Sequence, residues 1–409
     1  MNIVIISEFC DDFSQSDNDR FLYLAKMLTG VIGDNKKFQD CQDSVEIITS
    51  SFRHTTKKHR RSPVDDWPFK ITFIEEPGYT KNVCLKRFYS HYIWGKNLHA
   101  YLKNREKPDV VYCAVPSLTG SYLVARYCEK NNIRFIIDVQ DLWPEAFRMV
   151  FNIPIISSIV FAPFKMLADA VYKRADAICA VSETYCNRAL SVNKKCKTGT
   201  VVYLGTDLDK FDRYAAENQI LKKNPGEIWL AYCGTLGASY DLKIVFDALR
   251  ILNDRRIKFI IMGDGPQKEE FVRYSGGLNT VFTGRLSYEQ MCSIIKACDI
   301  AVNPIAHLAA QSIINKHADY AASGLPVLNT QENEEYKKLV CEYKMGFNVT
   351  NNDVHFLAKK LKDLVENKDL RMLMGNGARK CAIERFDRTS TYNLLEEQIL
   401  VSPLTHKNS

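Results

Sequence analysis

Short apolar runs rich in β-branched residues alternate with longer helical segments along the chain, and they do so in two blocks. The strand-like runs of the first block are Ile3–Ile6, Val45–Thr49, Ile71–Ile74, Val110–Cys113, Arg134–Asp138 and Ala177–Val181. Those of the second block are Ile228–Cys233, Lys258–Met262, Thr280–Thr283, Ile300–Asn303 and Gly346–Val349. Strands that alternate with helices predict a parallel sheet covered by helices on both faces. We therefore predict an α/β protein with two doubly wound domains.

A chain of 409 residues is too long for one hydrophobic core, which also favours two domains. The alternation pauses in a polar, charged stretch, Lys210 to Gly226, which we interpret as a linker region. We place an N-terminal domain at residues 1–206 and a C-terminal domain at residues 207–385. Ligands of doubly wound sheets bind at the carboxyl ends of the strands, so a cleft between the domains is expected there.

The composition is that of a globular protein in a reducing compartment. Apolar residues make up 46% of the chain and charged residues 25%, and the opening MNIVIISEF lacks the basic start of a signal peptide. Thirteen cysteines without a C-x-x-C pair predict free, buried thiols in the cytoplasm rather than disulfides or zinc ligands. The longest apolar run, Ile153 to Phe164, is shorter than the about 20 residues that span a bilayer. We interpret this run either as a helix packed on the neighbouring domain or as a segment that contacts a membrane surface.

Most of the net charge of +7 lies in the first half of the chain. Its tightest basic cluster, His54 to Arg61, is predicted to be a loop. This loop either carries solvated charge or meets an anionic membrane or acceptor. Nucleic acid is disfavoured as a partner because the cluster lacks interleaved aromatic residues and the total charge is modest.

The stretch Ser312 to Asn329 predicts a loop, a helix whose first turn Asn315 caps, a stop at Gly324-Leu325-Pro326 and a buried strand. The amides at the helix start, the helix dipole and Lys316 together form a candidate anion site. An ordinary helix stop explains the same residues when they are considered alone.

Glycine turns follow three strands of the second block and favour the anion site. They include Gly234, Gly263, Gly265 and Gly284. Turns at the same edge of a sheet allow the backbone to approach a phosphate closely. None completes G-x-G-x-x-G or a P-loop, which disfavours a dinucleotide-dependent dehydrogenase or an ATPase.

Two D-x-D patterns are weak metal signals. Asp17 and Asp19 precede a helix, and Asp207 and Asp209 lie at the domain boundary. Two carboxylates without further oxygen ligands rarely hold Mg²⁺, so we interpret both pairs as capping or turn residues. No metal site is predicted.

The first block offers a polar strand end at Asp138 to Glu145. Gln140, Asp141 and Glu145 beside Trp143 suit recognition of a hydroxylated ring. An aspartate cap before a helix, with the indole buried, explains the segment equally well.

At this point the chain resembles a known family, the retaining, two-domain GT-B glycosyltransferases of family 4, especially the bacterial members that build capsule and O-antigen. The segments that carry the resemblance are Gly78-Tyr79 with Asn82, Arg87 and Ser90, Pro108–Val111, Asp141–Glu145, Ala175–Ser182, Leu204–Asp207, Tyr232–Gly237, Gly263–Pro266, Phe282–Gly284, Ala297–Asp299 and Asp319–Val327. The resemblance implies two Rossmann-like domains facing a central cleft. It also implies a C-terminal helix, within residues 386–409, that returns to the first domain.

In such enzymes the second domain binds a nucleotide-sugar donor, here expected to be a UDP-sugar, and the first binds the acceptor. The resemblance implies that Asp319 binds the ribose hydroxyls and that Asn315 and Lys316 bind the pyrophosphate. It also implies that Gln311 and Ser312 contact the sugar. The donor site would further include Gly234, Thr235, Gly263, Gly265 and Arg285. Gln140, Asp141 and Gln311 are the candidate catalytic residues, and Trp143 and Glu145 the candidate acceptor residues. Neither a metal nor a cofactor is required.

The chain departs from the family pattern at several of these positions. The Glu-x7-Glu pair appears as Gln311 and Asp319, and the usual acceptor-side histidine is Gln140. Thr235 replaces an arginine, and Tyr240 or Asp241 replaces a lysine. Because a diphosphate needs cationic partners, Lys316 and Arg285 are the candidates to compensate.

The sequence thus predicts a retaining glycosyltransferase of bacterial surface polysaccharide synthesis. It would act on a glycan or a polyprenyl-diphosphate-linked acceptor, in the cytoplasm or at the inner face of the membrane. The alternatives are a nucleotide-sugar epimerase of the same architecture and a nucleotide-sugar-binding partner without transfer activity.

Overall fold

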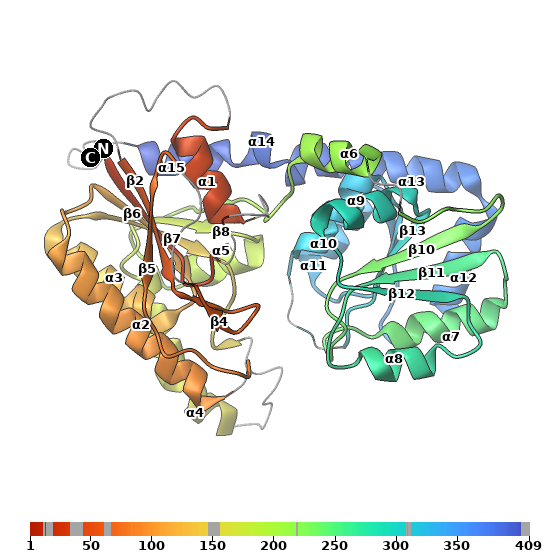
Figure 1. Cartoon of the computed structure of the whole chain (residues 1–409), viewed down its shortest axis with the longest axis horizontal. Coiled ribbons are helices and arrows are strands. Elements are labelled where there is room, and N and C mark those ends of the chain that lie inside the picture. Colours follow the sequence, from red (N-terminus) through yellow and green to blue (C-terminus); the bar gives the residue numbers. More distant parts are fainter. Residues whose placement is uncertain are drawn as a thin grey trace. The chain divides into compact units, whose positions relative to one another are not determined.

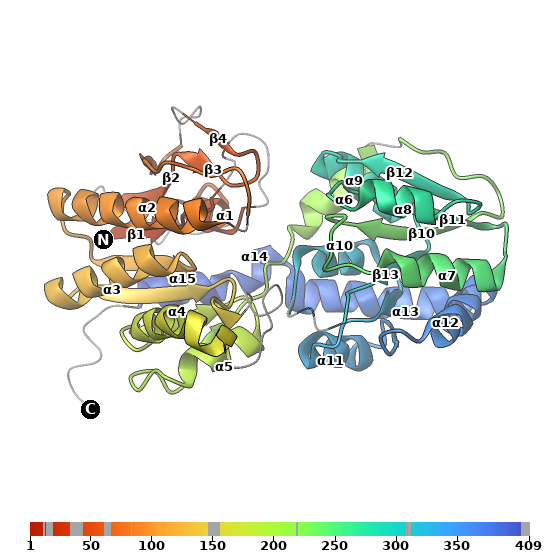
Figure 2. The ribbon, with the colours of Figure 1, turned by 90° about the horizontal axis from the view of Figure 1, so that it is seen from below.

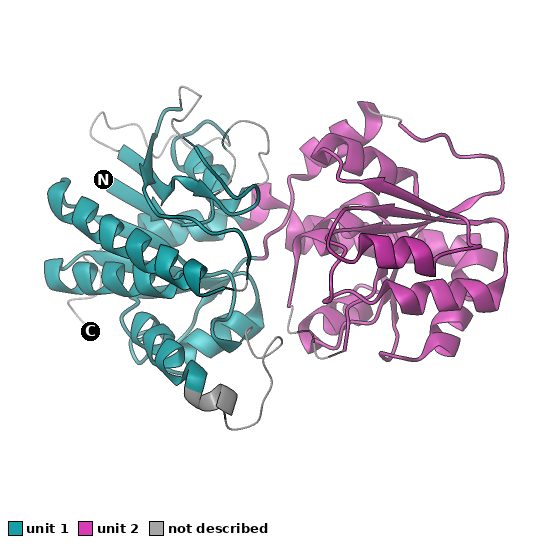
Figure 3. Ribbon diagram, turned by 60° about the horizontal axis from the view of Figure 1, so that its bottom comes forward, with its two compact units in different colours: residues 1–202, 392–409 teal, residues 203–391 magenta. Residues whose placement is uncertain are grey.

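The structure is a computed structural model that describes residues 1–10, 13, 19–32, 44–60, 67–82, 84–145, 156–217, 220–307, 309 and 312–401. The chain forms two compact units, Met1–Val202 with Tyr392–Ser409 and Tyr203–Thr391 (Figure 3). Each unit contains one parallel sheet flanked by helices (Figure 1). The predicted α/β class with two doubly wound, Rossmann-like sheets is confirmed.

The first unit is built on a seven-stranded sheet in the order β5-β2-β1-β6-β7-β8-β9. Its strands are β1 (Asn2–Ile6), β2 (Ser44–Ser50), β5 (Lys70–Ile74), β6 (Val110–Val115), β7 (Arg134–Val139), β8 (Ala177–Ala180) and β9 (Thr200–Val201). Its helices are α1 (Arg20–Leu28), α2 (Leu85–Asn104), α3 (Leu118–Asn131), α4 (Ile156–Tyr172), α5 (Glu183–Leu190) and α15 (Asn393–Leu400). All six residues of the central strand β6 are buried, as expected for a strand covered on both faces.

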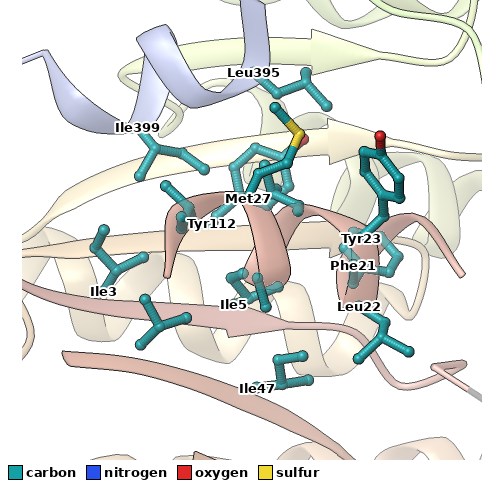
Figure 4. Close-up of a cluster of buried hydrophobic side chains, with 14 of the residues drawn as sticks. Ile3, Ile5, Phe21, Leu22, Tyr23, Met27, Ile47, Tyr112, Leu395 and Ile399 are labelled. Carbon is teal, nitrogen blue, oxygen red and sulfur yellow. The ribbon is translucent and has the colours of Figure 1, made fainter. Parts of the chain in front are cut away.

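The core of this unit includes the end of the chain. Ile3 and Ile5 of β1 pack with Tyr112 of β6, and Leu395 and Ile399 of α15 belong to the same buried cluster (Figure 4). The C-terminal helix therefore lies on the sheet of the first unit, on the side of α1.

The second unit is built on a six-stranded sheet in the order β12-β11-β10-β13-β14-β15. Its strands are β10 (Ile228–Cys233), β11 (Ile257–Met262), β12 (Thr280–Gly284), β13 (Ile300–Asn303), β14 (Val327–Asn329) and β15 (Gly346–Asn348). Its helices are α6 (Leu208–Glu217), α7 (Leu242–Leu252), α8 (Lys268–Tyr274), α9 (Tyr288–Ala297), α10 (Asn315–Ser323), α11 (Glu334–Glu342), α12 (Val354–Glu366), α13 (Lys368–Cys381), the π-helical η2 (Ala382–Phe386) and α14 (Arg388–Thr391). Figure 2 shows α10 beside the end of β13.

The predicted linker is wrong over much of its length. Residues up to Glu217 belong to helix α6, which packs on α9 within the second unit. Leu208 and Phe211 are buried at a helical spacing of three, and the charged residues between them concealed this short apolar face.

The basic cluster His54 to Arg61 is also not a plain loop. Over its described part, β3 (Phe52–Arg53) and β4 (Lys58–His59) pair as an antiparallel hairpin. Lys57 has a φ of 58° in the turn, an unusual conformation for a lysine that the sequence did not indicate. Arg61 lies outside the described residues.

Twelve cysteines lie in the described part of the chain, and none of them forms a disulfide with another described residue. Most of these thiols are buried, as expected from their apolar surroundings. None of the described helices combines the length and the apolar character that crossing a membrane requires.

Candidate functional site

Helix α10 begins at the residues that the sequence singled out. Its N-cap is Ile314 in an extended conformation, and no side-chain oxygen caps the first turn. The predicted cap, Asn315, is therefore wrong, because Asn315 is already the first helical residue. The His317 ring accepts from the Ile314 amide at 3.3 Å instead. In the described part of the chain, the amides of Asn315 and Lys316 have no hydrogen-bond acceptor, so the positive end of the helix is open.

Lys316 is buried and forms no ion pair with the carboxylate of any described residue. Its Nζ lies 3.9 Å from the ring centroid of Tyr240 and 4.4 Å from that of Tyr232. Only 6% of the residue is exposed, and no described residue forms a hydrogen bond with Nζ. Burial lowers the pKa of this ammonium to about 7. Ring faces attract a cation but do not neutralise it, so the group is suited to an incoming anion.

The glycine turns interlock beside this ammonium. A Cβ on Gly234 would lie 3.7 Å from Lys316 Nζ, and one on Gly263 would lie 1.9 Å from the Gly234 carbonyl oxygen. A Cβ on Gly265 would lie 2.3 Å from the Leu236 carbonyl oxygen. The structure thus brings Gly234, Gly263 and Gly265 together, at a closeness that only glycine permits.

Two further predicted donor residues lie at the ends of these strands. Thr235 follows Gly234 and is exposed, and its carbonyl accepts from the Tyr232 hydroxyl at 2.8 Å. Arg285 directly follows β12 and is also exposed. Among the described residues, no acidic side chain forms an ion pair with Arg285.

Asp319 lies one turn after Lys316 on α10 and is 5% exposed. The Tyr288 hydroxyl donates to its Oδ1 at 3.0 Å, and the same hydroxyl lies 2.5 Å from Thr206 Oγ1. Burial raises the pKa of Asp319 to about 6, although the Tyr288 hydrogen bond and the charge of Arg388 oppose the shift. Residues three apart share one side of a helix, so a cation and a carboxyl group are presented together.

Ser312 is buried before α10 and is held by its own unit. Its hydroxyl donates to Glu335 Oε2 at 3.0 Å, and its carbonyl accepts from Gln331 Nε2 at 2.6 Å. Glu335 was missed by the sequence analysis, although its place two residues after the capping Asn333 marks a helix start. Gln311 lies outside the described residues.

The polar segment of the first unit follows β7. Asp141 accepts from the Leu142 amide at 2.9 Å and from the Trp143 indole N–H at 3.2 Å. Burial raises the pKa of this carboxyl group. The side-chain nitrogen of Gln140 is buried and donates to no described residue, while its backbone amide donates to the Val115 carbonyl.

Trp143 and Glu145, the predicted acceptor residues, are both held by neighbours. The indole is 6% exposed and stacks on His91, at 5.7 Å between centroids and 8° between planes. The guanidinium of Arg87 lies 4.7 Å from the same ring. Glu145 accepts from Arg188 Nε at 2.6 Å. Trp143 therefore shows little of its face to solvent.

Two carboxyl groups near this segment escaped the sequence analysis. Glu8 follows β1 and Glu76 follows β5, and both side chains are buried. His91 Nε2 lies 3.5 Å from Glu8 Oε1. Burial and the nearby Glu76 raise the pKa of Glu8 well above its usual value, and burial lowers the pKa of His91 to about 3. Their positions after strands were the available signal, because strand ends carry sites in doubly wound sheets.

Two of the D-x-D residues that the structure describes, Asp19 and Asp207, act as caps, and Asp209 lies in the first turn of α6. Asp19 accepts from the amides of Phe21 and Leu22 at the start of α1. Asp207 accepts from the Lys210 amide at the start of α6. Asp17 lies outside the described residues.

Comparison with known proteins finds a similarity between the second unit and one sequence family. Residues 214–381 match the family described as "Glycosyl transferases group 1". An uncharacterised glycosyltransferase of Methanocaldococcus jannaschii is 23% identical over 241 residues, which are 54% of this chain and 58% of that protein. A sulfoquinovosyl transferase of Arabidopsis thaliana is 26% identical over 201 residues, 47% of this chain and 38% of that protein. The chain thus spans about half the length of these curated relatives.

Solved structures match the whole chain. Sucrose-phosphate synthase from Thermosynechococcus elongatus has a TM-score of 0.72 at 15% identity and covers 97% of both chains. Anabaena HepE in complex with UDP has a TM-score of 0.67 at 13% identity, and the match covers 97% of this chain and 99% of the HepE chain. WaaG, a glycosyltransferase involved in lipopolysaccharide biosynthesis, has a TM-score of 0.65 at 13% identity. The match covers 98% of this chain and 99% of the WaaG chain. The protein therefore has the GT-B fold.

Proposed function

We propose that the protein is a retaining glycosyltransferase that transfers a sugar from a nucleotide-sugar donor to a glycan or lipid-linked glycan acceptor. The observation that carries this proposal is the buried ammonium of Lys316, which has no hydrogen-bond partner among the described residues and lies beside the Gly234 turn, with Asp319 one turn further along the same helix. The family match over residues 214–381 includes all three positions and supports the same activity.

The donor diphosphate would lie against the start of α10. The amides of Asn315 and Lys316 and the Lys316 ammonium would supply donors and positive charge, and Gly234 places no side chain beside the ammonium. The resemblance places a lysine at Tyr240 or Asp241, and the centroid of the Tyr240 ring lies 3.9 Å from Lys316 Nζ. The cation that this loop lacks would thus come from α10, and the exposed Arg285 would be a second cationic partner of the diphosphate.

Asp319 would accept hydrogen bonds from the ribose hydroxyls. Ser312, held by Glu335, and Gln311 would lie on the sugar side of the diphosphate. A UDP-sugar is the donor we favour, since the structurally similar HepE was solved with UDP.

In the transfer step the bond between the anomeric carbon and the diphosphate oxygen breaks, and a bond from the acceptor hydroxyl oxygen forms on the same face of the sugar. The acceptor proton passes to the leaving diphosphate oxygen. Charge grows on the diphosphate as its bond breaks, and fixed donors that are already in place stabilise it. Lys316 and the helix amides supply that charge, so the proposed step requires neither a metal ion nor a cofactor.

The first unit, with domain limits near residues 1–206 and 386–409, would hold the acceptor. Asp141, which accepts from the Leu142 amide and the Trp143 indole, would bind the acceptor hydroxyl. Gln140 offers a buried side-chain nitrogen that lacks a described acceptor, and Trp143 and Glu145 would shape the site. A role in bacterial surface polysaccharide synthesis, in the cytoplasm or at the inner membrane face, follows the likeness to WaaG.

A donor screen tests the proposal. UDP-, GDP- and TDP-sugars are first compared by thermal shift, and the labelled sugars that bind are then assayed for transfer and for slow hydrolysis. Hydrolysis or transfer of one donor is expected. Binding without either reaction would favour a nucleotide-sugar-binding partner, to which the replacement of the Glu-x7-Glu pair by Gln311 and Asp319 lends support. Conversion of the sugar to its epimer without an acceptor would favour an epimerase.

A further inference from the structure

Large apolar side chains are exposed on two helices of the first unit. On α2 they are Leu85, 88% exposed, with Tyr89 and Tyr92. On α4 they are Met166, 72% exposed, and Val160. Single exposed apolar residues are ordinary, whereas a group on adjoining elements marks a binding surface.

These residues form one surface rather than scattered points. Leu85, Tyr89, Tyr92 and Lys96 recur at spacings of four, three and four, which places them along one stripe of α2. The two helices meet through the rings of Phe88 and Phe164, whose centroids are 5.3 Å apart. We call Leu85, Phe88, Tyr89 and Tyr92 with Val160, Phe164 and Met166 the α2–α4 surface.

Most of the charge on the two helices of the α2–α4 surface is positive. Helix α2 contains no acidic residue in its 20 positions, and Lys86, Lys96 and Lys103 on it are exposed. Lys96 lies over the ring of Tyr92, 5.7 Å from its centroid. On α4 the single acid, Asp169, is paired with Lys165 at 3.2 Å. An apolar, tyrosine-bearing stripe with a lysine rim complements an anionic bilayer.

The basic hairpin at residues 54–60 is less suited to this role. Lys57 donates to Asn82 at 2.6 Å and lies over the Tyr79 ring. The guanidinium of Arg60 donates to the Cys10 and Ser50 carbonyls and lies 4.5 Å from the Phe73 ring. Lys57 and Arg60, which the sequence suggested as membrane contacts, therefore interact with residues of their own unit.

We propose that the α2–α4 surface docks the protein on an anionic membrane, with Leu85, Tyr89, Tyr92 and Met166 entering the interface between headgroups and acyl chains. The membrane contact would bring a lipid-linked acceptor to the first unit, and only this step rests on the proposed function. Arg87, in the same turn of α2 as Phe88, lies against Trp143 beside the candidate acceptor residues. A lipid-linked acceptor would thus be presented where the first unit meets the bilayer.

Vesicle binding tests the docking surface directly. The intact protein is sedimented with phosphatidylcholine vesicles that contain or lack phosphatidylglycerol. We compare wild type, Leu85→Ser/Tyr89→Ser/Met166→Ser and a matched control, Met372→Ser/Leu373→Ser, which removes two exposed apolar side chains from the second unit. Wild type and control should bind the anionic vesicles, while the triple variant should lose at least about tenfold in partition. Lys86→Gln/Lys96→Gln should weaken binding to anionic vesicles only.

Other outcomes would overturn the proposal. These are no binding of wild type to anionic vesicles, undiminished binding of the triple variant, or an equal loss in the control. Self-association of wild type in sedimentation velocity, abolished in the triple variant, would assign the surface to a second copy of the chain. Hydrolysis of the donor sugar in solution should be unchanged in the triple variant. That measurement separates failure of the docking surface from failure of the proposed function.

Discussion

At the scale of one residue, the proposed anion site depends on the surroundings of Lys316. An ammonium that is taken out of water without a carboxylate partner loses part of its preference for the charged form, and burial lowers its pKa to about 7. The ring faces of Tyr232 and Tyr240 partly stabilise the ammonium at this buried position. A diphosphate would supply the missing partner, so donor binding and protonation of Lys316 should be linked.

The first prediction is that donor affinity falls with rising pH. In the free protein Lys316 loses its proton above about pH 7, whereas a bound diphosphate holds the proton and raises the pKa. Binding then takes up a proton, and affinity should fall by up to about tenfold per pH unit above pH 7. Calorimetry of UDP-sugar binding in buffers of different ionisation enthalpy measures this uptake. Lys316→Arg should bind without the pH dependence, because arginine stays charged. A flat profile in wild type, or the same slope in the variant, would contradict the assignment.

The second prediction separates the two ends of the donor. Asp319→Ala should weaken nucleoside diphosphate binding by about 1.5–3 kcal/mol, because charge-assisted hydrogen bonds to the ribose are lost. Pyrophosphate, which has no ribose, should bind unchanged. Lys316→Ala should show the reverse, with a larger loss for diphosphates than for the nucleoside. Tyr288→Phe is the control, since it removes the hydrogen bond to Asp319 but keeps the ring. Equal losses for all ligands would mean that neither side chain has the role assigned to it.

At the scale of elements, the site depends on how closely two turns approach. The turn after β10 and the turn after β11 are joined by hydrogen bonds from the Gly234 amide to the Met262 carbonyl, and from the Leu236 amide to the Asp264 carbonyl. Both turns are fixed to adjacent strands of one sheet. Gly263 and Gly265 are therefore requirements of packing.

The third prediction compares two glycines. Gly263→Ala would place a Cβ 1.9 Å from the Gly234 carbonyl oxygen, at a φ of 153°. It should destabilise the protein by about 3 kcal/mol or more and weaken donor binding. Gly277 also has a positive φ, 81°, but a Cβ there would meet nothing within 4 Å. Gly277→Ala should cost about 1 kcal/mol through backbone strain alone and leave donor binding intact. Urea unfolding and calorimetry measure both effects, and similar values for the two variants would refute the steric argument.

The same scale explains what could be predicted from the sequence. Strands such as Val110–Val115 and Ile228–Cys233 are continuous apolar runs, because parallel strands are covered on both faces, and this pattern is readable without a structure. Helix α6 was missed because only Leu208 and Phe211 mark its buried face. The cap of α10 was misassigned because a good capping residue, Asn315, directly follows the true cap position. Local propensity does not fix such boundaries to one residue.

Part of the candidate site was predictable in its local structure. Helix starts and glycine turns leave a local pattern, and both lie where the pattern indicated. The ring faces around Lys316 were not predictable, because Tyr232 and Tyr240 lie more than 70 residues before it and reach it only through the sheet. Glu8 and Glu76 of the first unit were missed for the same reason. Their burial depends on contacts with α2 that no short stretch of sequence encodes.

At the scale of the whole molecule, the chain crosses from the first unit to the second after Val202 and returns at Tyr392. The first unit is therefore incomplete until the last helix of the chain has been made. Leu395 and Ile399 of α15 are fully buried in its core, next to residues of α1 and β6 (Figure 4). This connection makes the stability of the first unit depend on a segment almost 200 residues away from the rest of that unit.

The fourth prediction tests that dependence with two neighbouring leucines of α15. Leu395 is fully buried and Leu394 is 46% exposed, so the same substitution removes the same atoms from a core and from a surface. Leu395→Ala should destabilise the first unit by about 2–5 kcal/mol, because a cavity remains where the side chain packed. Leu394→Ala should stay within about 0.5 kcal/mol of wild type. Native-state hydrogen exchange measures the effect in each unit. Amides of β1 and β6 should lose protection in Leu395→Ala, while those of β10 and β11 should keep it. Equal loss in both sheets would mean that the units unfold as one, and no loss in β1 would mean that α15 does not support the first sheet.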